Sequence, residues 1–280
     1  MRIRKMMNDD IDFALSLTSI EGWSDIRSDF EALISYSPTA AFVLEDSDDY
    51  IGMISAISYG VFGFIGNLIV HPLYRGQGYG IQLLRYGIKQ LQDLGTPYFM
   101  LDAVPEALSL YEKHGFRPVC KSYRLRGKIS ELDSENVREI SEEDLPTIYE
   151  IDKEYFGADR SHFLRNKWMG SPNLCVCLEQ EGNIVSYAMG SHRDEYVRVA
   201  PWVVTVHGDF NGDLLRAIGH FSGGRELAMG ILETSTRAYD LALSNGLALG
   251  EYSHSIRMVK GNILPTFSPN QYAIGAPSTG

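Results

Sequence analysis

The feature that most constrains this chain is a run of three alternate glycines placed between an apolar strand and an amphipathic helix. The apolar stretch Phe64–Val70 leads, through Pro72, into Arg75-Gly76-Gln77-Gly78-Tyr79-Gly80. Glycines leave backbone N–H groups bare, and the start of a helix adds positive potential, so together they favour a diphosphate. Arg75 can add a charge-assisted hydrogen bond at the rim. The apolar face of the following helix is formed by Ile81, Leu84, Ile88 and Leu91.

Three other interpretations of this loop compete with a diphosphate site. The dinucleotide fingerprint G-x-G-x-x-G fails on spacing, because the residue three after Gly78 is Ile81. A Walker-type nucleotide loop would need Gly-Lys-Ser/Thr, which is absent here. A plain glycine turn explains the glycines but not their coincidence with Arg75 and Pro72.

Predicted strands and helices alternate along the chain, and the order occurs twice. Helices of the first half are expected at 8–17, 28–34, 81–95 and 106–114, and its strands at 1–6, 41–44, 50–58, 64–70, 98–103 and 116–125. The second half opens in the same way, with a short strand and an acidic helix start at Val137–Pro146. Further elements are expected at 174–178, 184–190, 202–206, 213–221, 227–232 and 237–245. The order predicts an α/β fold with a mixed sheet, helices on both faces, and a weak internal duplication.

A polar, charge-rich stretch at Lys121–Ser134 is the expected domain boundary, which gives domains 1–127 and 128–280. The net charge of -11 argues against a nucleic-acid groove or an anionic membrane surface. No apolar run is long enough to span a bilayer, and the N-terminus turns acidic where a signal peptide would be apolar, so a cytoplasmic protein is expected. Three cysteines fit reduced thiols better than disulfides, and Cys175 and Cys177 should share one strand face without binding a metal.

The glycine loop resembles a known signature. Val70-His71-Pro72-Leu73-Tyr74-Arg75-Gly76-Gln77-Gly78-Tyr79-Gly80 is similar to the acetyl-CoA motif of the GNAT N-acetyltransferases, V-x-P followed by Arg/Gln-x-x-Gly-x-Gly/Ala. A second segment, Leu110-Tyr111-Glu112-Lys113-His114-Gly115-Phe116, resembles the family's Leu-Tyr-x-Lys-x-Gly-Phe. Residues 1 to 126 carry the resemblance, and residues 128 to 280 look like the companion domain of tandem GNAT proteins.

The resemblance implies an N-acetyltransferase that moves an acetyl or short acyl group from acetyl-CoA to a primary amine by direct attack. Tyr111 would be the general acid, and a backbone N–H of Ile69 or Val70 would stabilise the oxyanion. No spacing selects a catalytic base among Asp102, Glu106, Glu21 and Asp25, and a water relay is an equal alternative. The implied cofactor-binding residues are Leu68, Ile69, Val70, Arg75, Gly76, Gln77, Gly78, Tyr79 and Gly80.

The second half lacks the glycine motif. At the equivalent place Asp209 and Asp213 would repel a diphosphate at a helix start. The expected role of this domain is therefore to wall off the acceptor pocket. On the resemblance alone, the substrate-side candidates are Trp23, Arg160, Trp202 and Arg257.

Three function classes remain in competition at this point. The first is the acetyltransferase, and the second is a non-catalytic acyl-CoA-binding sensor or partner-binding module. The third is nucleotide binding at the same loop. The acceptor can be a small-molecule amine or a peptide, and the acidic charge favours a cationic one. The oligomeric state is open, a homodimer included.

Overall fold

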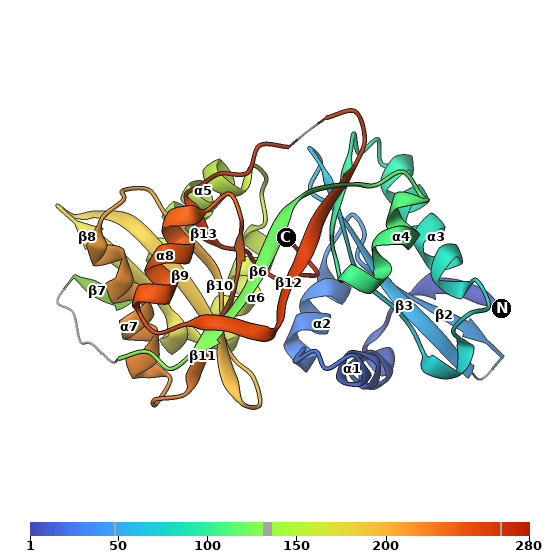
Figure 1. Ribbon diagram of the computed structural model, residues 1–280, viewed down its shortest axis with the longest axis horizontal. Coiled ribbons are helices and arrows are strands. Elements are labelled where there is room, and N and C mark those ends of the chain that lie inside the picture. The colour runs from blue at the N-terminus through green and yellow to red at the C-terminus, as the bar shows by residue number, and fades with distance from the viewer. Residues whose placement is uncertain (48, 131–135, 264) are drawn as a thin grey trace. The chain divides into compact units, whose positions relative to one another are not determined.

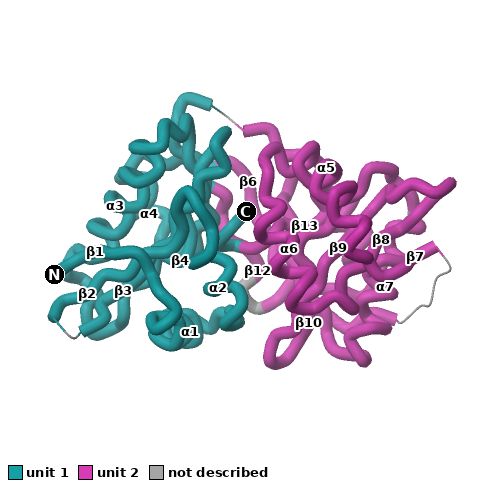
Figure 2. Tube along the Cα trace, turned by 180° about the vertical axis from the view of Figure 1, so that it is seen from behind, with its two compact units in different colours: residues 1–118, 258–264, 277–280 teal, residues 119–257, 265–276 magenta. Residues whose placement is uncertain are grey.

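The computed structural model describes residues 1–47, 49–130, 136–263 and 265–280, which divide into two compact units. Unit 1 comprises Met1–Pro118, Met258–Leu264 and Pro277–Gly280, and unit 2 comprises Val119–Arg257 and Pro265–Ala276. Figure 2 shows that each unit takes in stretches from distant parts of the sequence. After Arg257 the chain contributes short segments to each unit in turn: Met258–Leu264 to unit 1, Pro265–Ala276 to unit 2 and Pro277–Gly280 to unit 1.

Unit 1 is built on strands that follow one another from β1 to β5. Neighbouring strands are antiparallel except β4 and β5, which are parallel. Helices α1 and α2 lie on one side of strands β2 and β3, and α3 lies on the other (Figure 1). The strands are β1 (Arg2–Lys5), β2 (Ala41–Asp46), β3 (Asp49–Ser58), β4 (Gly63–Val70) and β5 (Phe99–Ala103), and the helices α1 (Ile11–Ile20), α2 (Arg27–Ser35), α3 (Tyr79–Asp93) and α4 (Leu108–Glu112).

Helix α3 packs closely on β3 because a glycine faces the sheet. A side chain at Gly87 would place its Cβ 2.9 Å from Ile54 Cδ1. The apolar face of the helix, with Leu83, Leu84 and Leu91 fully buried, forms the core on this side of the sheet. The predicted helix is confirmed; of its predicted apolar face, Leu84, Ile88 and Leu91 are buried and Ile81 is half-buried.

Unit 2 repeats the same sequence of elements. Its strands run in the order β6-β11-β10-β9-β8-β7, and β13 pairs with β10. The strands are β7 (Val137–Glu139), β8 (Cys175–Gln180), β9 (Asn183–His192), β10 (Tyr196–Val204), β11 (Glu226–Leu232) and β13 (Gln271–Ala273), and the helices α5 (Leu145–Phe156), α6 (Ser161–Gly170), α7 (Gly212–Phe221) and α8 (Thr236–Ser244). Strands β6 (Arg117–Gly127) and β12 (Ala248–Lys260) lie mainly in unit 2, but the first two residues of β6 and the last three of β12 belong to unit 1. The thiols of Cys175 and Cys177 are free and lie in one core cluster, as expected for residues two apart on a strand.

A charged clamp present in both units shows the duplication directly. In unit 1 the Arg4 guanidinium donates two hydrogen bonds to Asp10, of 2.7 and 2.9 Å, and reaches Glu45 at 2.8 Å. In unit 2 Arg138 donates to Asp144 at 2.6 and 2.9 Å and to Glu179 at 2.6 Å. Each residue lies 134 positions after its counterpart (4 and 138, 10 and 144, 45 and 179). The same spacing and the same bonds indicate one scaffold used twice.

The polar stretch at Lys121–Ser134, the expected domain boundary, overlaps a strand in its first part. Strand β6 runs through it to Gly127, while residues 131–135 lie outside the described chain. Its charges are used in pairing across the sheet: Arg126 Nε donates to Glu226 on β11 at 2.6 Å. Strand β13 was not predicted, because its three residues are too few to show a period.

None of the helices in the described ranges has the length and apolar character that a bilayer crossing requires.

Candidate active site

Strand β4 separates from β5 after its first two residues. Among the described residues, the two strands pair at Gly63 with Phe99 and at Phe64 with Met100. Beyond this point Asn67 adopts a left-handed conformation (φ +48°), and the register with β3 shifts by one residue. This is a β-bulge, which bends a strand and re-aims its edge. Among the described residues, the part of β4 from the bulge to Val70 therefore presents an edge that β5 does not cover.

The glycine loop continues directly from this edge. Gly76 and Gly78 have φ of +77° and +86°, and a Cβ at either position would have no atom within 4 Å. Gly78 is the N-cap of α3, and its carbonyl accepts the hydrogen bonds of Ile81 and Gln82. The earlier N–H groups of a helix have no carbonyl one turn back, so they are available to a ligand. The loop thus combines an open surface with the positive end of a helix.

Arg75 is held by its own loop and by a carboxylate. Its Nε donates to the Val70 carbonyl at 2.9 Å, and its guanidinium forms an ion pair with Glu21 at the end of α1. About half of its side chain is exposed. One of the four acidic residues considered as a base, Glu21, is therefore paired with Arg75 of the glycine loop.

Tyr111 lies on α4 and is buried, with 8% of its surface exposed. Its ring meets Phe116 edge to face at 5.9 Å between centroids. Burial raises the pKa of its phenol to about 12. The hydroxyl consequently keeps its proton at neutral pH, which a general acid requires.

The corresponding place in unit 2 is filled by the chain itself. Strands β10 and β11 pair from Tyr196 to Val199, after which a bulge near Pro201 shifts the register of β10 with β9. Strand β13 then pairs with β10 at Trp202–Ala273 and Val203–Gln271. The Ile274 amide donates to the Gly230 carbonyl of β11 at 2.9 Å. A protein strand thus occupies the edge that is uncovered in unit 1.

The four substrate-side candidates are not gathered in one unit. Trp23 lies in the turn after α1 of unit 1, is 37% exposed, and donates its backbone N–H to Thr18. Arg160, Trp202 and Arg257 belong to unit 2. Arg257 is buried, with its guanidinium 5.6 Å from the centre of the Phe267 ring.

Arg160 and Trp202 each make internal contacts that account for their burial. Arg160 donates two 2.8 Å hydrogen bonds to Asp152, which also contacts the Tyr187 hydroxyl. Trp202 is fully buried and donates to Ser186 Oγ at 3.2 Å. These contacts favour structural roles, and substrate binding by either residue stays a prediction.

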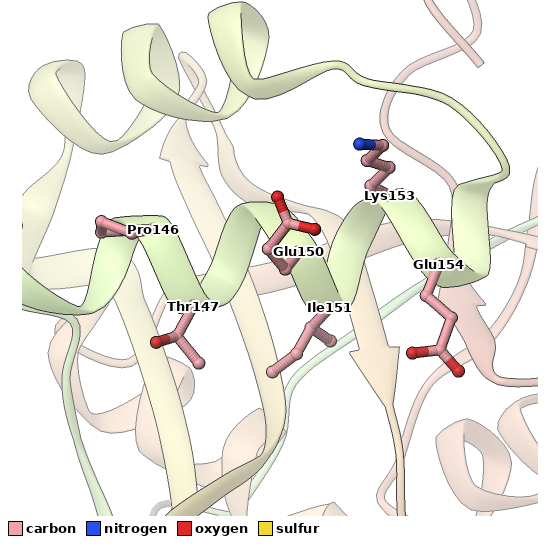
Figure 3. Close-up of a pocket in the computed structure, with 6 residues that line it drawn as sticks. All are labelled: Pro146, Thr147, Glu150, Ile151, Lys153 and Glu154. Atoms are coloured by element: carbon pink, nitrogen blue, oxygen red, sulfur yellow. The ribbon is translucent and has the colours of Figure 1, made fainter.

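A shallow hollow in unit 2 runs along α5 and is lined by that helix alone. Figure 3 shows Glu150 and Lys153 on one side of the helix and Thr147, Ile151 and Glu154 on another. No second element contributes a lining residue in the part of the chain that the structure describes. The hollow is therefore a helix surface rather than a site with converging groups.

Sequence reasoning missed the bulge, the ion pair of Arg75 with Glu21, and the strand that fills unit 2. One signal for the bulge was present, since the pair Gly66-Asn67 interrupts an apolar strand. The other two depend on residues 54 positions apart and on a three-residue strand. Local patterns carry no information on either.

Comparison with known proteins agrees with this geometry. The model of the acetyltransferase (GNAT) family matches residues 6–116, and that of an acetyltransferase (GNAT) domain matches residues 148–273. The chain is 31% identical over 123 residues to acetyltransferase SG1711 of Sodalis glossinidius, covering 40% of this chain and 84% of that protein. It is 25% identical over 204 residues to the uncharacterized N-acetyltransferase YitH of Bacillus subtilis, covering 70% and 71%.

The fold is shared with solved structures at low sequence identity. A crystal structure from Pyrococcus horikoshii superposes with a TM-score of 0.82 at 21% identity, over 100% of this chain and 95% of that one. The two matched regions fall in the two units, in the order that the duplication predicts. The uncovered β4 edge, the glycine loop and these matches lead to one assignment: the chain belongs to the GNAT acetyltransferase family and carries two GNAT domains in tandem.

Proposed function

We propose that this protein transfers an acetyl or short acyl group from acetyl-CoA to a primary amine, and that unit 1 performs the reaction. The observation that carries the proposal is the uncovered edge of β4 leading straight into the glycine loop. An extended amide-bearing arm can pair with the edge while a diphosphate meets the loop amides. Both features lie within Leu68–Gly80.

The fit of coenzyme A to this segment rests on open space and on donors. The positions of Gly76 and Gly78 have room for a close approach, and the start of α3 supplies N–H groups. Gln77, Tyr79 and Gly80 complete the loop that would surround the diphosphate, with Arg75 at its rim. Leu68, Ile69 and Val70 would pair with the pantetheine arm through their main chain.

Strand geometry favours Val70 over Ile69 as the oxyanion donor. The His71 N–H donates to Ile51 of β3 at 2.9 Å. Successive N–H groups of a strand point to opposite edges, so the N–H of Val70 is directed toward the uncovered edge. The N–H of Ile69 is directed toward β3. A donor at this edge would stabilise negative charge on the thioester oxygen.

The reaction forms one bond and breaks one. The neutral amine nitrogen attacks the acyl carbon, and the carbon–sulfur bond breaks after a tetrahedral state. The departing thiolate takes a proton from the Tyr111 hydroxyl, and the new amide gives up its extra proton to solvent. Tyr111 recovers its proton from water, which its pKa of about 12 strongly favours. Acceptor binding by unit 2 remains part of the proposal and concerns Trp202, Arg160 and Arg257, with Trp23 on unit 1.

The test is thiol release from acetyl-CoA in the presence of a panel of primary amines, with the acylated amine identified by mass. The expected result is thiol release that depends on at least one amine and matches product one for one. Calorimetry with coenzyme A should show one site per chain. Tight coenzyme A binding without amine-dependent release would favour a sensor, and absent binding would overturn the assignment.

A further inference from the structure

A segment distant in sequence lies against β4 at Gly66, within unit 1. A Cβ at Gly66 would be 2.6 Å from Ser278 Cα and 2.7 Å from the Ser278 carbonyl oxygen. Both are backbone atoms, so no change of rotamer could relieve the clash. Only glycine permits this approach, and we name Pro277–Gly280 the covering segment.

The covering segment lies on the side of the sheet that faces away from α3. A Cβ at Gly63 would meet Leu91 of α3, so the residue three positions later on the strand faces the other side. On β3, Ile54 and Ala56 contact α3 at Gly87, so Ser55 between them also faces away. The register pairs Ser55 directly with Gly66. The segment therefore lies against Gly66, on the face of the sheet to which the neighbouring Ser55 also points.

Ser55 beneath this segment has an unsatisfied hydroxyl. Its side chain is 0% exposed, and Ser55 Oγ has no hydrogen-bond partner among the described residues. Leaving a buried hydroxyl unpaired costs about 1–3 kcal/mol. A polar group of a ligand would remove that cost if it took the place of the segment.

A side-chain hydrogen bond from Tyr59 connects the covering segment to the sheet. The Tyr59 hydroxyl donates to the Thr279 carbonyl at 2.7 Å. The ring of Tyr59 packs against Tyr36 and Phe62, with centroids 6.3 and 5.2 Å apart. A neighbouring bond offers a matched control, because Tyr36 donates to the Ser58 carbonyl, also at 2.7 Å.

From these contacts we propose that Ser55 and Gly66 form an acceptor subsite and that the covering segment is a strap that lifts when the amine binds. This rests on the proposed function, because acyl-CoA at the α3 side leaves the amine to approach from the opposite face. The Ser55 hydroxyl pairs with a second polar group of the amine, such as a hydroxyl or carbonyl. The segment contacts β4 at Gly66, one residue before the bulge at Asn67, where the uncovered edge begins.

The first experiment changes the hydrogen bond of the strap. Tyr59→Phe should lower the KM of ethanolamine by about 3–10-fold, because one hydrogen bond of about 0.5–1.5 kcal/mol no longer opposes lifting. Tyr36→Phe should leave this KM unchanged. An unchanged or raised KM in Tyr59→Phe, or equal effects in the two variants, would overturn the strap.

The second experiment removes the Ser55 hydroxyl. Ethanolamine and propylamine differ by a hydroxyl in place of a methyl, so the ratio of their kcat/KM values reports the second polar group. Ser55→Ala should lower this ratio by about 3–10-fold. Ser58→Ala is the control, because Ser58 lies on the same strand but pairs with Thr96 at 3.0 Å. A ratio that stays constant in Ser55→Ala removes Ser55 from the subsite.

A third measurement does not depend on turnover. Hydrogen exchange of the peptide that contains residues 277–279 should accelerate when ethanolamine is added with coenzyme A, and in Tyr59→Phe without any ligand. If the wild-type protein binds coenzyme A but acylates no amine, the proposed function fails. The exchange rate of this peptide still tests whether the covering segment lifts. The strap proposal would be overturned if neither ethanolamine nor the Tyr59→Phe change altered the exchange rate of this peptide.

Discussion

Unit 1 and unit 2 share a scaffold and differ at one strand edge. Both bend a central strand with a bulge, at Asn67 in β4 and near Pro201 in β10. In unit 1 the edge beyond the bulge is left uncovered by β5, whereas in unit 2 β13 pairs with it. An uncovered edge has unpaired N–H and C=O groups that favour a partner. The comparison teaches that a strand of the protein itself can pair with an edge that would otherwise be open to a ligand.

The loops after these strands differ in the same sense. Unit 1 has glycines of positive φ and no acidic side chain between Arg75 and Gly80. In unit 2, Asp213 lies in the first turn of α7 and contacts Arg216, while a Cβ at Gly208 would clash with Phe210. A carboxylate in a first helical turn disfavours an anion there. Both differences favour unit 1 over unit 2 as the proposed binding site of the acyl donor.

The largest expected effect follows from a tyrosine in unit 1. Tyr111→Phe should lower kcat by about 10²–10⁴-fold, because the departing thiolate loses its proton donor. Coenzyme A affinity, measured by calorimetry, should change less than about twofold. Tyr272→Phe in unit 2 is the control, since this buried phenol pairs with His207 of the same unit and should not affect kcat. Full activity in Tyr111→Phe would remove it from catalysis.

Variants of the buried ion pair between Arg160 and Asp152 distinguish a structural role of Arg160 from a role in substrate binding. Arg160→Met should cost about 3–5 kcal/mol of unfolding free energy, because Asp152 is left as a buried charge. Replacing both residues, Arg160→Met with Asp152→Leu, should restore much of that loss in denaturant unfolding. Arg165→Met, which affects an exposed pair with Glu142, should cost less than about 1 kcal/mol. A raised amine KM in a stable double variant would show that Arg160 also binds the acceptor.

Replacing a left-handed glycine with alanine tests whether the glycine loop of unit 1 binds the diphosphate of coenzyme A. Gly78→Ala should weaken coenzyme A binding about 10-fold, because a left-handed conformation costs about 1–2 kcal/mol with a Cβ. Gly182→Ala carries the same strain at φ +77° in the β8–β9 turn of unit 2, again with no atom within 4 Å. Calorimetry should show normal affinity in that variant. Equal losses in both would mean that general destabilisation, not the loop, weakens binding.

The smallest expected effect concerns the clamp that the two units share. The hydrogen bond from Arg138 lowers the pKa of Asp144 to about 2 from an ordinary 3.8. Burial alone would raise the pKa of Asp10, but hydrogen bonds from Arg4, the Met7 amide and Tyr50 outweigh it and lower the value. Lowered carboxyl pKa values stabilise the fold above about pH 4, and that contribution is lost as the pH falls toward 2.

Each clamp should contribute about 1 kcal/mol, since solvent screens the partly exposed arginines. Asp144→Asn and Asp10→Asn should each flatten the pH dependence of unfolding between pH 4 and 2 by a similar amount. An effect in only one variant would show that the duplicated clamp has kept its role in one unit.

The sequence by itself determined the scaffold, the order of its elements and the place of the glycine loop. Those features depend on periods of two and 3.6 residues and on residues within one loop, so local patterns specify them. The clamp residues Arg4, Asp10, Arg138 and Asp144 are also present in the sequence, but only their contacts in the structure show that they pair with one another.

Tertiary structure alone decided which edge is uncovered and what covers each site. Strand β13, the ion pair of Arg75 with Glu21 and the covering segment over Ser55 join residues between 54 and more than 200 positions apart. No periodic signal extends over such separations. These contacts form only when the chain folds, because each is set by the packing of complete strands and helices rather than by the residues beside it.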